Sequence, residues 1–388
     1  MQTSDEQIIY LDNNATTRVD PRVVESMLPF FTEEYANPAS NHLFGVRVNQ
    51  AVRAAREKVA ELLNCSTGEL VFTSGATEAI NLAIKGFVRK NRDKGKHIIT
   101  VQTEHKAVLD VCASLETEGF ETTYLPVDSG GLINLEDLKN AFRPDTILVS
   151  VMYVNNETGV IQPIEEIARI THEHAAIFMT DATQAVGKIP VDVNKMGIDM
   201  LTFSGHKFYG PKGIGGLFFR GRRPNKVKLA TIQHGGGHES GLRSGTLNVP
   251  GIIGLGKACE IAMTEMEADA ARIKTLRDEL EQELIKSLNC KVNGNTEHRI
   301  YNTSNICIPG IDADALIIGL KNIIISTGSA CSSNSVESSH VLRAIGLSSS
   351  ELLSNIRISL SKTIKFHELA VSLRQITLKS QHLRILAQ

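Results

Sequence analysis

Ser204-Gly205-His206-Lys207 directly follows the apolar run Met200-Leu201-Thr202-Phe203. β-prone residues followed by small and polar residues predict a buried strand that ends in a tight loop. A lysine held at such a strand end is partly desolvated, which favours its neutral amine and makes it a candidate to form a Schiff base. Most lysines that follow a strand are solvated surface residues, so this stretch alone leaves both interpretations of Lys207 open.

A second strand-like run lies just upstream of this stretch. Ile177-Phe178-Met179-Thr180 ends at Asp181-Ala182-Thr183-Gln184, which predicts an acid and an amide at a neighbouring strand end. Asp181 and Gln184 can bind the ring nitrogen and the ring oxygen of a pyridine cofactor. A carboxylate facing the pyridinium nitrogen and a lysine on the aldehyde are the two groups that pyridoxal phosphate chemistry requires.

With these two stretches the chain resembles the cysteine desulfurases, which are pyridoxal-phosphate enzymes of the aspartate-aminotransferase fold. The resemblance runs from Tyr10-Leu11-Asp12-Asn13-Asn14-Ala15-Thr16-Thr17 to about Arg357-Ile358-Ser359-Leu360, nearly the whole chain. It implies an enzyme that converts L-cysteine to L-alanine with pyridoxal 5'-phosphate held on Lys207. It also implies that Ser204 and His206 hydrogen-bond the cofactor phosphate.

The composition is that of an ordinary globular chain. The 388 residues are 42% hydrophobic and 22% charged, and the net charge of -2 gives no reason to expect nucleic acid or an anionic membrane as a ligand. The length suits a large core and two or three domains. Residues 1–6 are polar, unlike a signal peptide, and no apolar run approaches the roughly 20 residues that would span a bilayer. We therefore expect a cytoplasmic protein.

Strand-like and helix-like segments alternate through much of the chain, which argues for a mostly parallel sheet with helices on both faces. Besides the two strands above, we expect strands at 70–73, 97–101, 122–127, 146–152 and 216–219, and helices at 48–63, 106–118, 135–142 and 163–173. A further helix follows the turn at 74–78 and runs through about Val88. A helical pattern from Pro250 to about Ser287 leads into a part with strands near 305–308 and 323–326.

The resemblance turns this pattern into a definite fold, the pyridoxal-phosphate-dependent transferase fold of the α/β class. It implies a large domain, residues 15–250, with a mostly parallel seven-stranded sheet flanked by helices. A smaller α+β domain would consist of residues 1–14 and 251–388 and would carry the catalytic cysteine loop.

Candidate site residues fall where this architecture places ligands, at the carboxyl ends of the strands. At or just after predicted strand ends lie Thr77, His105, Asn156, Asp181 and Lys207. This convergence is a structural argument that does not depend on the resemblance.

The turn Ser74-Gly75-Ala76-Thr77-Glu78 separates a predicted strand from a predicted helix. Free backbone N–H groups at a helix start form an anion site. The turn fits either an ordinary capped helix or a phosphate cradle, and the resemblance favours the cradle, with Ala76 and Thr77 at the cofactor phosphate.

His105 and Asn156 each permit two interpretations. His105 can be a helix-start histidine without a catalytic role, and Asn156 can be a turn former, since Asn-Asn is a common turn signal. In the family, a histidine at this position stacks on the cofactor ring and moves protons. The matching asparagine contacts the ring oxygen and the region of the substrate carboxylate.

The glycine-rich segment from His234 to Thr246 also permits two interpretations. His234 and His238 suggest a metal site, but no third ligand is placed to complete one, so we expect no metal. In relatives, the threonine that matches Thr246 reaches the cofactor phosphate of the partner subunit. A homodimer with cofactor sites at its interface is therefore expected.

Arg357 alternates with apolar neighbours in the strand-like run Asn355-Ile356-Arg357-Ile358-Ser359. A buried arginine in a strand needs an anionic partner, which is either a structural carboxylate or the carboxylate of the substrate. The resemblance favours the substrate, held by Arg357 together with Asn156.

Cys331 differs from the other five cysteines, which look structural and form no CxxC pair. It lies in Ser326-Thr327-Gly328-Ser329-Ala330-Cys331-Ser332-Ser333-Asn334-Ser335, a stretch too small and polar to be core. Such a loop can carry a thiolate into a buried site and out again. The resemblance implies that Cys331 attacks the substrate sulfur and keeps it as a persulfide. An acceptor protein would then take the sulfur for iron–sulfur cluster assembly or for tRNA or DNA thiolation.

Four rival interpretations can be weighed against this one. An aminotransferase of the same fold does not explain Cys331, whereas a selenocysteine lyase is compatible with it. A non-catalytic scaffold protein would be expected to lack Lys207 or Cys331, and both are present. A dinucleotide-binding dehydrogenase fails because no predicted strand is followed by G-x-G-x-x-G.

Overall fold

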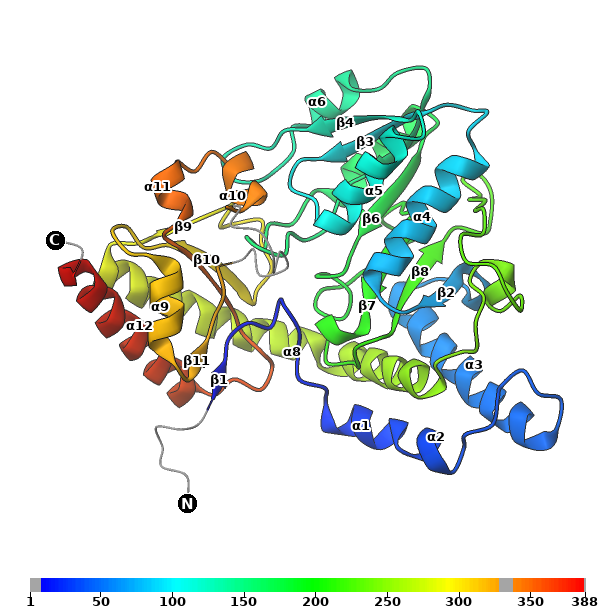
Figure 1. Cartoon of the computed structure of the whole chain (residues 1–388), viewed down its shortest axis with the longest axis horizontal. Helices are drawn as coiled ribbons and strands as arrows, with labels where there is room; N and C mark the ends of the chain where they lie inside the picture. The colour runs from blue at the N-terminus through cyan, green and yellow to red at the C-terminus, as the bar shows by residue number, and fades with distance from the viewer. Residues whose placement is uncertain (1–7, 328–337, 387–388) are drawn as a thin grey trace.

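The computed structural model describes residues 8–327 and 338–386. Its larger part is built on a seven-stranded sheet with the strand order β2-β8-β7-β6-β5-β3-β4 (Figure 1). The strands are β2 (Leu70–Thr73), β3 (His97–Val101), β4 (Glu121–Leu125), β5 (Thr146–Ser150), β6 (Ile177–Asp181), β7 (Met200–Ser204) and β8 (Gly215–Phe219). β8 runs antiparallel to both of its neighbours, and the other pairs are parallel. The prediction of a mostly parallel seven-stranded sheet is confirmed.

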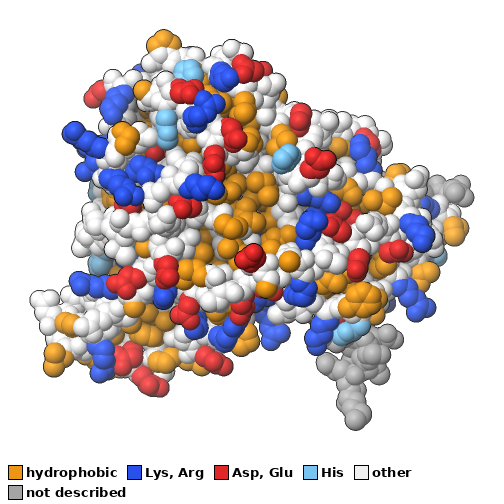
Figure 2. Space-filling model, turned by 180° about the vertical axis from the view of Figure 1, so that it is seen from behind, with side chains coloured by type: hydrophobic (Ala, Val, Ile, Leu, Met, Phe, Trp, Pro, Cys, Tyr) orange, Lys and Arg blue, Asp and Glu red, His pale blue; other side chains and the backbone are white. Residues whose placement is uncertain are grey.

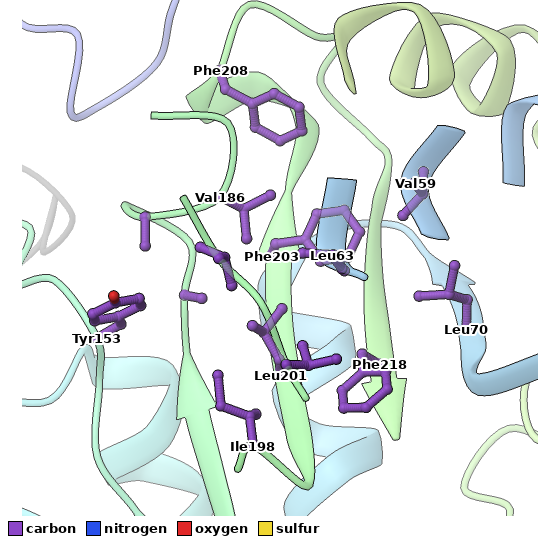
Figure 3. Packing of buried hydrophobic residues seen from close by; sticks show 14 of the residues in the cluster. Val59, Leu63, Leu70, Tyr153, Val186, Ile198, Leu201, Phe203, Phe208 and Phe218 are labelled. Atoms are coloured by element: carbon purple, nitrogen blue, oxygen red, sulfur yellow. The ribbon is translucent and has the colours of Figure 1, made fainter. Parts of the chain in front are cut away.

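Helices cover both faces of this sheet. The helices of this part of the chain are α1 (Pro21–Met27), α2 (Pro29–Thr32), α3 (Leu43–Leu63), α4 (Ala76–Lys90), α5 (Lys106–Glu116), α6 (Leu135–Asn140) and α7 (Ile164–Glu173). Adjacent residues of one strand point to opposite faces. Met200 therefore packs in the cluster that contains α4 and α5, whereas Leu201 and Phe203 pack in the cluster that contains α3 and α7 (Figure 3). Because both faces are covered, β7 is buried along its whole length and has an apolar sequence.

The smaller part contains two further sheets and is connected to the larger one by a long helix, α8 (Val249–Leu288). β1 (Ile9–Tyr10) pairs in parallel with β11 (Ile323–Ile324), and β9 (Lys291–Val292), β10 (Thr303–Cys307) and β12 (Asn355–Ser359) form an antiparallel sheet. The helices of this part are α9 (Ala313–Leu320), α10 (His340–Ala344), α11 (Ser349–Leu352) and α12 (Phe366–Leu386). Leu255 of α8 belongs to the core of the large sheet, whereas Ile273 and Leu280 belong to a second core.

The division into a large domain of residues 15–250 and a small domain of residues 1–14 and 251–388 stays a proposal. The pairing of β1 with β11 supports it, because this pairing brings the N-terminal segment into the part formed by the C-terminal half of the chain. α8 begins at Val249, close to the proposed boundary, and contributes to both cores.

The start of α3 differs from the sequence-based expectation. The helix begins at Leu43 rather than near Val48, because His42 acts as its N-cap and its Nδ1 accepts a hydrogen bond from the Gly45 amide at 3.1 Å. Histidine is not among the usual capping residues, so the common start signal was absent from the sequence. The helix ends at Asn64, whose φ of 53° is a left-handed C-cap conformation.

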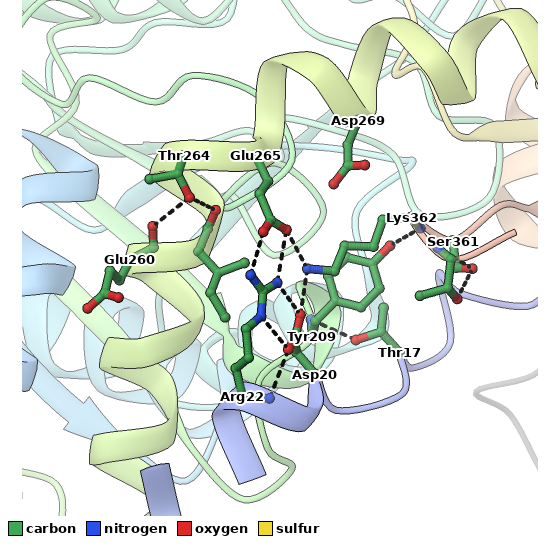
Figure 4. Close-up of polar contacts among 12 residues, drawn as sticks. Thr17, Asp20, Arg22, Tyr209, Glu260, Thr264, Glu265, Asp269, Ser361 and Lys362 are labelled. Carbon is green, nitrogen blue, oxygen red and sulfur yellow. Dashed lines mark hydrogen bonds and ion pairs between the residues drawn. The ribbon is translucent and has the colours of Figure 1, made fainter. Parts of the chain in front are cut away.

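A network of charged side chains joins the two parts (Figure 4). Lys362, which follows β12, places its Nζ 2.7 Å from Asp20 Oδ2 and 3.0 Å from Glu265 Oε2. Arg22 lies 2.8 Å from the Asp20 carboxylate and 2.6 Å from that of Glu265. The Tyr209 hydroxyl accepts a hydrogen bond from the Lys362 amide at 2.6 Å. The network therefore ties α1, α8 and the segment after β12 to the loop that follows β7.

Candidate active site

A cavity of about 460 Å³ lies at the carboxyl ends of β6 and β7. The predicted residues that line it are Ala76, Thr77, His105, Asn156, Asp181, Gln184, Ser204, His206, Lys207 and Arg357. Thr246 is exposed and does not line this cavity. Cys331 lies outside the described residues, and so does most of the loop that carries it.

Lys207 is placed by the end of β7 and by the 3₁₀ turn Gly205–Lys207 that follows it. Its Nζ donates hydrogen bonds to the backbone oxygens of Asn14 at 2.6 Å and of Ala15 at 2.8 Å. Sequence reasoning did not assign Asn14 to the site, although its side chain is buried and it lines the cavity. The N-terminal segment is therefore part of the site wall.

Asp181 is the last residue of β6 and is buried. One carboxylate oxygen accepts a hydrogen bond from the Thr183 amide at 3.0 Å, which fixes the side chain at the strand end. Gln184 follows in the same turn, and its Nε2 donates to the Asn14 oxygen at 2.9 Å. β6 and β7 are adjacent and parallel, so the carboxylate of Asp181 and the amine of Lys207 reach the same cavity.

The start of α4 forms another wall of the cavity. Gly75 is the N-cap residue, with a φ of 153° that favours glycine, and no side chain caps the helix. The first backbone N–H groups of a helix lack intrahelical partners, so Ala76 and Thr77 offer donors to an anion in the cavity. The carboxylate of Glu78 is held at this turn by Arg243, with Nε and Oε1 2.7 Å apart.

His206 contributes a neutral ring to the cavity. Its burial, together with the positive charges of Lys207 and Lys212, lowers the pKa of His206 to about 4. Its Nδ1 lies 3.0 Å from the Thr16 hydroxyl. The ring therefore acts at neutral pH through hydrogen bonds and not through charge.

His105 both caps a helix and lines the cavity. Its Nδ1 accepts a hydrogen bond from the Ala107 amide at 3.1 Å at the start of α5. A ring nitrogen that accepts an N–H carries no proton, so the neutral ring has its proton on Nε2. The interpretation as a helix-start histidine is therefore correct for Nδ1, and in the neutral ring the proton is on Nε2.

Arg357 lies on β12 and is buried. Its Nη2 is 2.6 Å from Asp12 Oδ1, and its Nη1 donates to the Asn156 backbone oxygen at 3.0 Å. Of the two partners that the sequence allowed for Arg357, a structural carboxylate is therefore present, and it belongs to Asp12. Because Arg357 also lines the cavity, Asp12 positions the guanidinium there while part of its charge is neutralised.

The described residues on either side of the cysteine loop are anchored beside the site. Ser326 forms a backbone bridge to Arg357, with the Arg357 amide donating to the Ser326 oxygen at 2.6 Å. On the other side, the Ser339 hydroxyl donates to Glu157 Oε2 at 2.6 Å, and His340 Nε2 lies 2.9 Å from the Glu104 backbone oxygen.

Two buried acids accompany these anchors and were not found by sequence reasoning. Burial, followed by the charge of Asp181, raises the pKa of Glu104 well above its usual range. Burial also raises the pKa of Glu157. Each acid stands directly beside a predicted site residue, His105 or Asn156, but no sequence pattern distinguishes a buried acid in a loop from a solvated one.

The donor set fits a phosphorylated pyridine aldehyde. The cavity offers an amine on Lys207, a carboxylate on Asp181 and the uncapped start of α4. The hydroxyl of Thr183 also lines it and is buried without a hydrogen-bond partner in the part of the chain that the structure describes. Within the same described residues, no three or more His, Cys, Asp or Glu side chains are grouped as metal ligands would be.

Comparisons with known proteins agree with this chemistry. The aminotransferase class-V family matches residues 9–370. The chain is 50% identical over 378 residues to "Cysteine desulfurase IscS" of Anaeromyxobacter sp. (strain K), covering 97% of this chain and 93% of that one. Among solved structures it is similar to a "NIFS-LIKE PROTEIN", with a TM-score of 0.91, 40% identity and coverage of 97% and 100%. It is also similar to "SspA in complex with cysteine", with a TM-score of 0.81, 41% identity and coverage of 90% and 98%.

Proposed function

The chain belongs to the aminotransferase class-V family, and on the premise that it is a pyridoxal-phosphate-dependent cysteine desulfurase we propose which of its residues carry the reaction. The observation that carries the proposal is the meeting of Asp181 and Lys207 in one cavity, at adjacent strand ends and beside the start of α4. Pyridoxal phosphate, when bound, supplies an electron sink for the bond-breaking steps at the substrate Cα and Cβ.

Six residues that line the cavity would hold the cofactor. The Nζ of Lys207 is the amine that bonds its aldehyde, and the Asp181 carboxylate holds a proton on its ring nitrogen. The amides of Ala76 and Thr77 and the side chains of Ser204 and His206 would donate hydrogen bonds to its phosphate. All six residues line the cavity.

The substrate is oriented by the other end of the cavity. Arg357 and Asn156 bind the L-cysteine carboxylate, which determines the bond that faces the cofactor. His105 moves protons through Nε2, and the released amine of Lys207 takes up and returns the Cα proton. Asp12 keeps the guanidinium of Arg357 in place through the 2.6 Å ion pair.

Cys331 accepts the sulfur. Its thiolate attacks the sulfur of the substrate, so that an S–S bond forms while the substrate Cβ–S bond breaks. The electron pair of the broken bond stays with the substrate carbon, which takes up a proton and leaves as L-alanine. The anchoring of Ser326 and Ser339 beside the cavity supports this role, although Cys331 itself lies outside the described residues.

We further propose that the functional unit is a homodimer, in which Thr246 reaches the cofactor phosphate of the partner subunit. Thr246 is exposed and outside its own cavity, and large apolar side chains such as Phe31, Tyr35 and Leu43 are more than half exposed at 59%, 69% and 89%. Figure 2 shows hydrophobic side chains gathered across the middle of the face turned away from the viewer in Figure 1. Both features support burial against another chain.

The persulfide sulfur passes to an acceptor protein that serves iron–sulfur cluster assembly or nucleic-acid thiolation. A cytoplasmic location also stays a prediction. Of the helices in the described part of the chain, none has the length and apolar character needed to cross a membrane.

The test is alanine formation by the purified protein, loaded with pyridoxal phosphate and given L-cysteine. Lys207→Ala and Cys331→Ala should each lower the rate of alanine formation at least about 100-fold. Cys65→Ala is the matched control, since burial raises the pKa of Cys65 to about 12 and keeps it a thiol at neutral pH. Alanine formation that survives Cys331→Ala would remove Cys331 from the mechanism and favour a lyase, and no alanine from the loaded wild type would overturn the assignment.

A further inference from the structure

Lys188 is a buried amine to which the mechanism above assigns no role. It is 3% exposed, and its Nζ donates a hydrogen bond to Gln184 Oε1 at 2.6 Å. Within residues 8–327 and 338–386, no carboxylate lies within ion-pair distance of it. Burial of an amine without an acidic partner is costly and is found mainly where the group has a function.

A continuous chain of hydrogen bonds connects Lys188 to Lys207. Lys188 donates to the oxygen of the Gln184 amide, and the nitrogen of the same amide donates to the Asn14 oxygen at 2.9 Å. The same Asn14 oxygen accepts from Lys207 Nζ at 2.6 Å. Gln184 lines the cavity, whereas Lys188 stands behind it.

These hydrogen bonds fix the orientation of the Gln184 side-chain amide, which otherwise has two nearly isosteric orientations. An ammonium group has donors and no acceptor, so Gln184 must turn its oxygen toward Lys188. Its NH₂ group then faces Asn14 and the cavity with two hydrogens, of which Asn14 accepts one. The second hydrogen is left for an acceptor oxygen of the bound ligand.

We propose that Lys188 is a positioning residue of the cofactor site, which holds Gln184 in the orientation that presents an N–H donor to the ring oxygen of the cofactor. The proposal rests on the proposed function, because it takes Lys207 and Gln184 as cofactor-binding residues. Without Lys188, only the backbone oxygen of Asn14 selects between the two orientations of the amide, and the turned amide presents its carbonyl oxygen to another oxygen, which is repulsive.

The constraint on the Gln184 amide is strongest while Lys188 is protonated. Burial, followed by the positive charges of Lys207 and Arg357, lowers the pKa of Lys188 to about 7. Below this pH the ammonium has no acceptor and dictates the orientation of Gln184, whereas above it the neutral amine still donates but also carries a lone pair and dictates the orientation less strictly. His206, whose pKa Lys188 helps to lower, is neutral here and does not compete for the amide.

The experiment compares Lys188→Met and Lys188→Arg in the cofactor-loaded enzyme. Methionine keeps the approximate shape and removes the donor, whereas arginine keeps the donors. The readouts are the dissociation constant of the cofactor and the pH midpoint of the visible absorption band of the cofactor bound to Lys207. A hydrogen-bond donor to the ring oxygen stabilises the anionic form of that oxygen. It therefore disfavours protonation of the neighbouring nitrogen that joins Lys207 to the cofactor, which lowers the pH midpoint.

Lys188→Met should raise the midpoint by roughly one pH unit and weaken cofactor binding about tenfold, and Lys188→Arg should restore both toward wild type. Lys195→Met is the matched control on the exposed surface and should leave both unchanged. A midpoint in Lys188→Met equal to that of the wild type would overturn the proposal while leaving the proposed function intact. A wild type that shows no visible band would instead contradict the assignment of Lys207.

Two measurements keep the proposal testable if the Lys188 variants do not fold. Gln184→Glu removes the N–H donor while keeping an acceptor for Lys188, and it should raise the midpoint in the same direction. A crystal structure of the cofactor-loaded wild type should show Lys188 bonded to Gln184 and the Gln184 nitrogen at the ring oxygen. Contact of Lys188 with a carboxylate, or an amide nitrogen turned away from the ring oxygen, would contradict the proposal.

Discussion

Asp181 and Lys207 are held by the register of two neighbouring parallel strands. Asp181 is paired with Thr202 across β6 and β7, and Lys207 follows β7 after a single turn. Small changes to either side chain therefore leave the backbone that carries it in place. Substitution at these positions reports on chemistry more than on folding.

Asp181→Asn should lower kcat roughly 100-fold or more, because an amide cannot keep a proton on the cofactor ring nitrogen. The melting temperature of the cofactor-free protein should change little. Steady-state alanine formation measures the first effect and thermal unfolding the second. A kcat close to that of the wild type would show that Asp181 does not face the ring nitrogen.

Arg357→Lys should raise KM for L-cysteine about tenfold, because a lysine cannot reproduce the planar, bidentate contact of a guanidinium with a carboxylate. Arg169→Lys is the matched control, as Arg169 is exposed and pairs with Glu173 on α7. If Arg357→Lys lowers only stability and leaves KM unchanged, then Arg357 serves Asp12 and not the substrate.

At the scale of elements, the start of α4 combines the proposed phosphate cradle with an acid, Glu78. Glu78 accepts from the Ser74 amide at 2.6 Å and pairs with Arg243, which lies three residues before Thr246. Burial alone would raise the pKa of Glu78, but these hydrogen bonds lower it. The carboxylate is thus charged, and Arg243 offsets its repulsion of an anion.

Arg243→Met should weaken cofactor binding about tenfold, because it leaves the charge of Glu78 unopposed beside the phosphate. Combining it with Glu78→Gln should recover much of the loss, which a double-mutant cycle of dissociation constants measures. Additive effects of the two substitutions would show that the pair does not act as a unit at the cradle.

The sequence predicted the elements of the large sheet well, because parallel strands covered on both faces must be apolar. It also brought Asp181 and Lys207 together, since their strand ends follow from the same pattern. It did not predict the hydrogen bonds of Asn14 or the ion pair of Asp12 with Arg357. Both depend on the N-terminal segment lying beside distant strands, and no local periodicity records such a contact.

At the scale of the whole molecule, the network of Asp20, Arg22, Glu265 and Lys362 fixes the two parts relative to each other (Figure 4). The hydrogen bond from Arg22, opposed by burial and aided by Lys362, holds the pKa of Asp20 well below its usual range. In the unfolded chain, the carboxyl group of Asp20 titrates at about pH 4. The stabilisation by Asp20 is therefore complete above that pH and is lost as the pH falls below it toward the depressed pKa of the folded state.

Asp20→Asn should lower the free energy of unfolding by about 1–3 kcal/mol at pH 7, since it leaves the largely buried Lys362 and the exposed Arg22 short of a partner. The difference from wild type should shrink as the pH falls below about 4. Denaturant unfolding at several pH values measures both, with Asp93→Asn on the exposed surface as the control. A difference that grows toward low pH would contradict the assigned direction of the shift.

In the proposed reaction, one sulfur atom moves from the substrate to Cys331 in a site built around Lys207. The most direct measurement is peptide mass spectrometry after a single turnover with one equivalent of L-cysteine and no acceptor. We expect that the peptide containing Cys331 gains the mass of one sulfur, that a reducing thiol removes it, and that Lys207→Ala shows no gain. Alanine formed while Cys331 stays unmodified, or the added sulfur found on Cys65 instead, would contradict the proposed reaction.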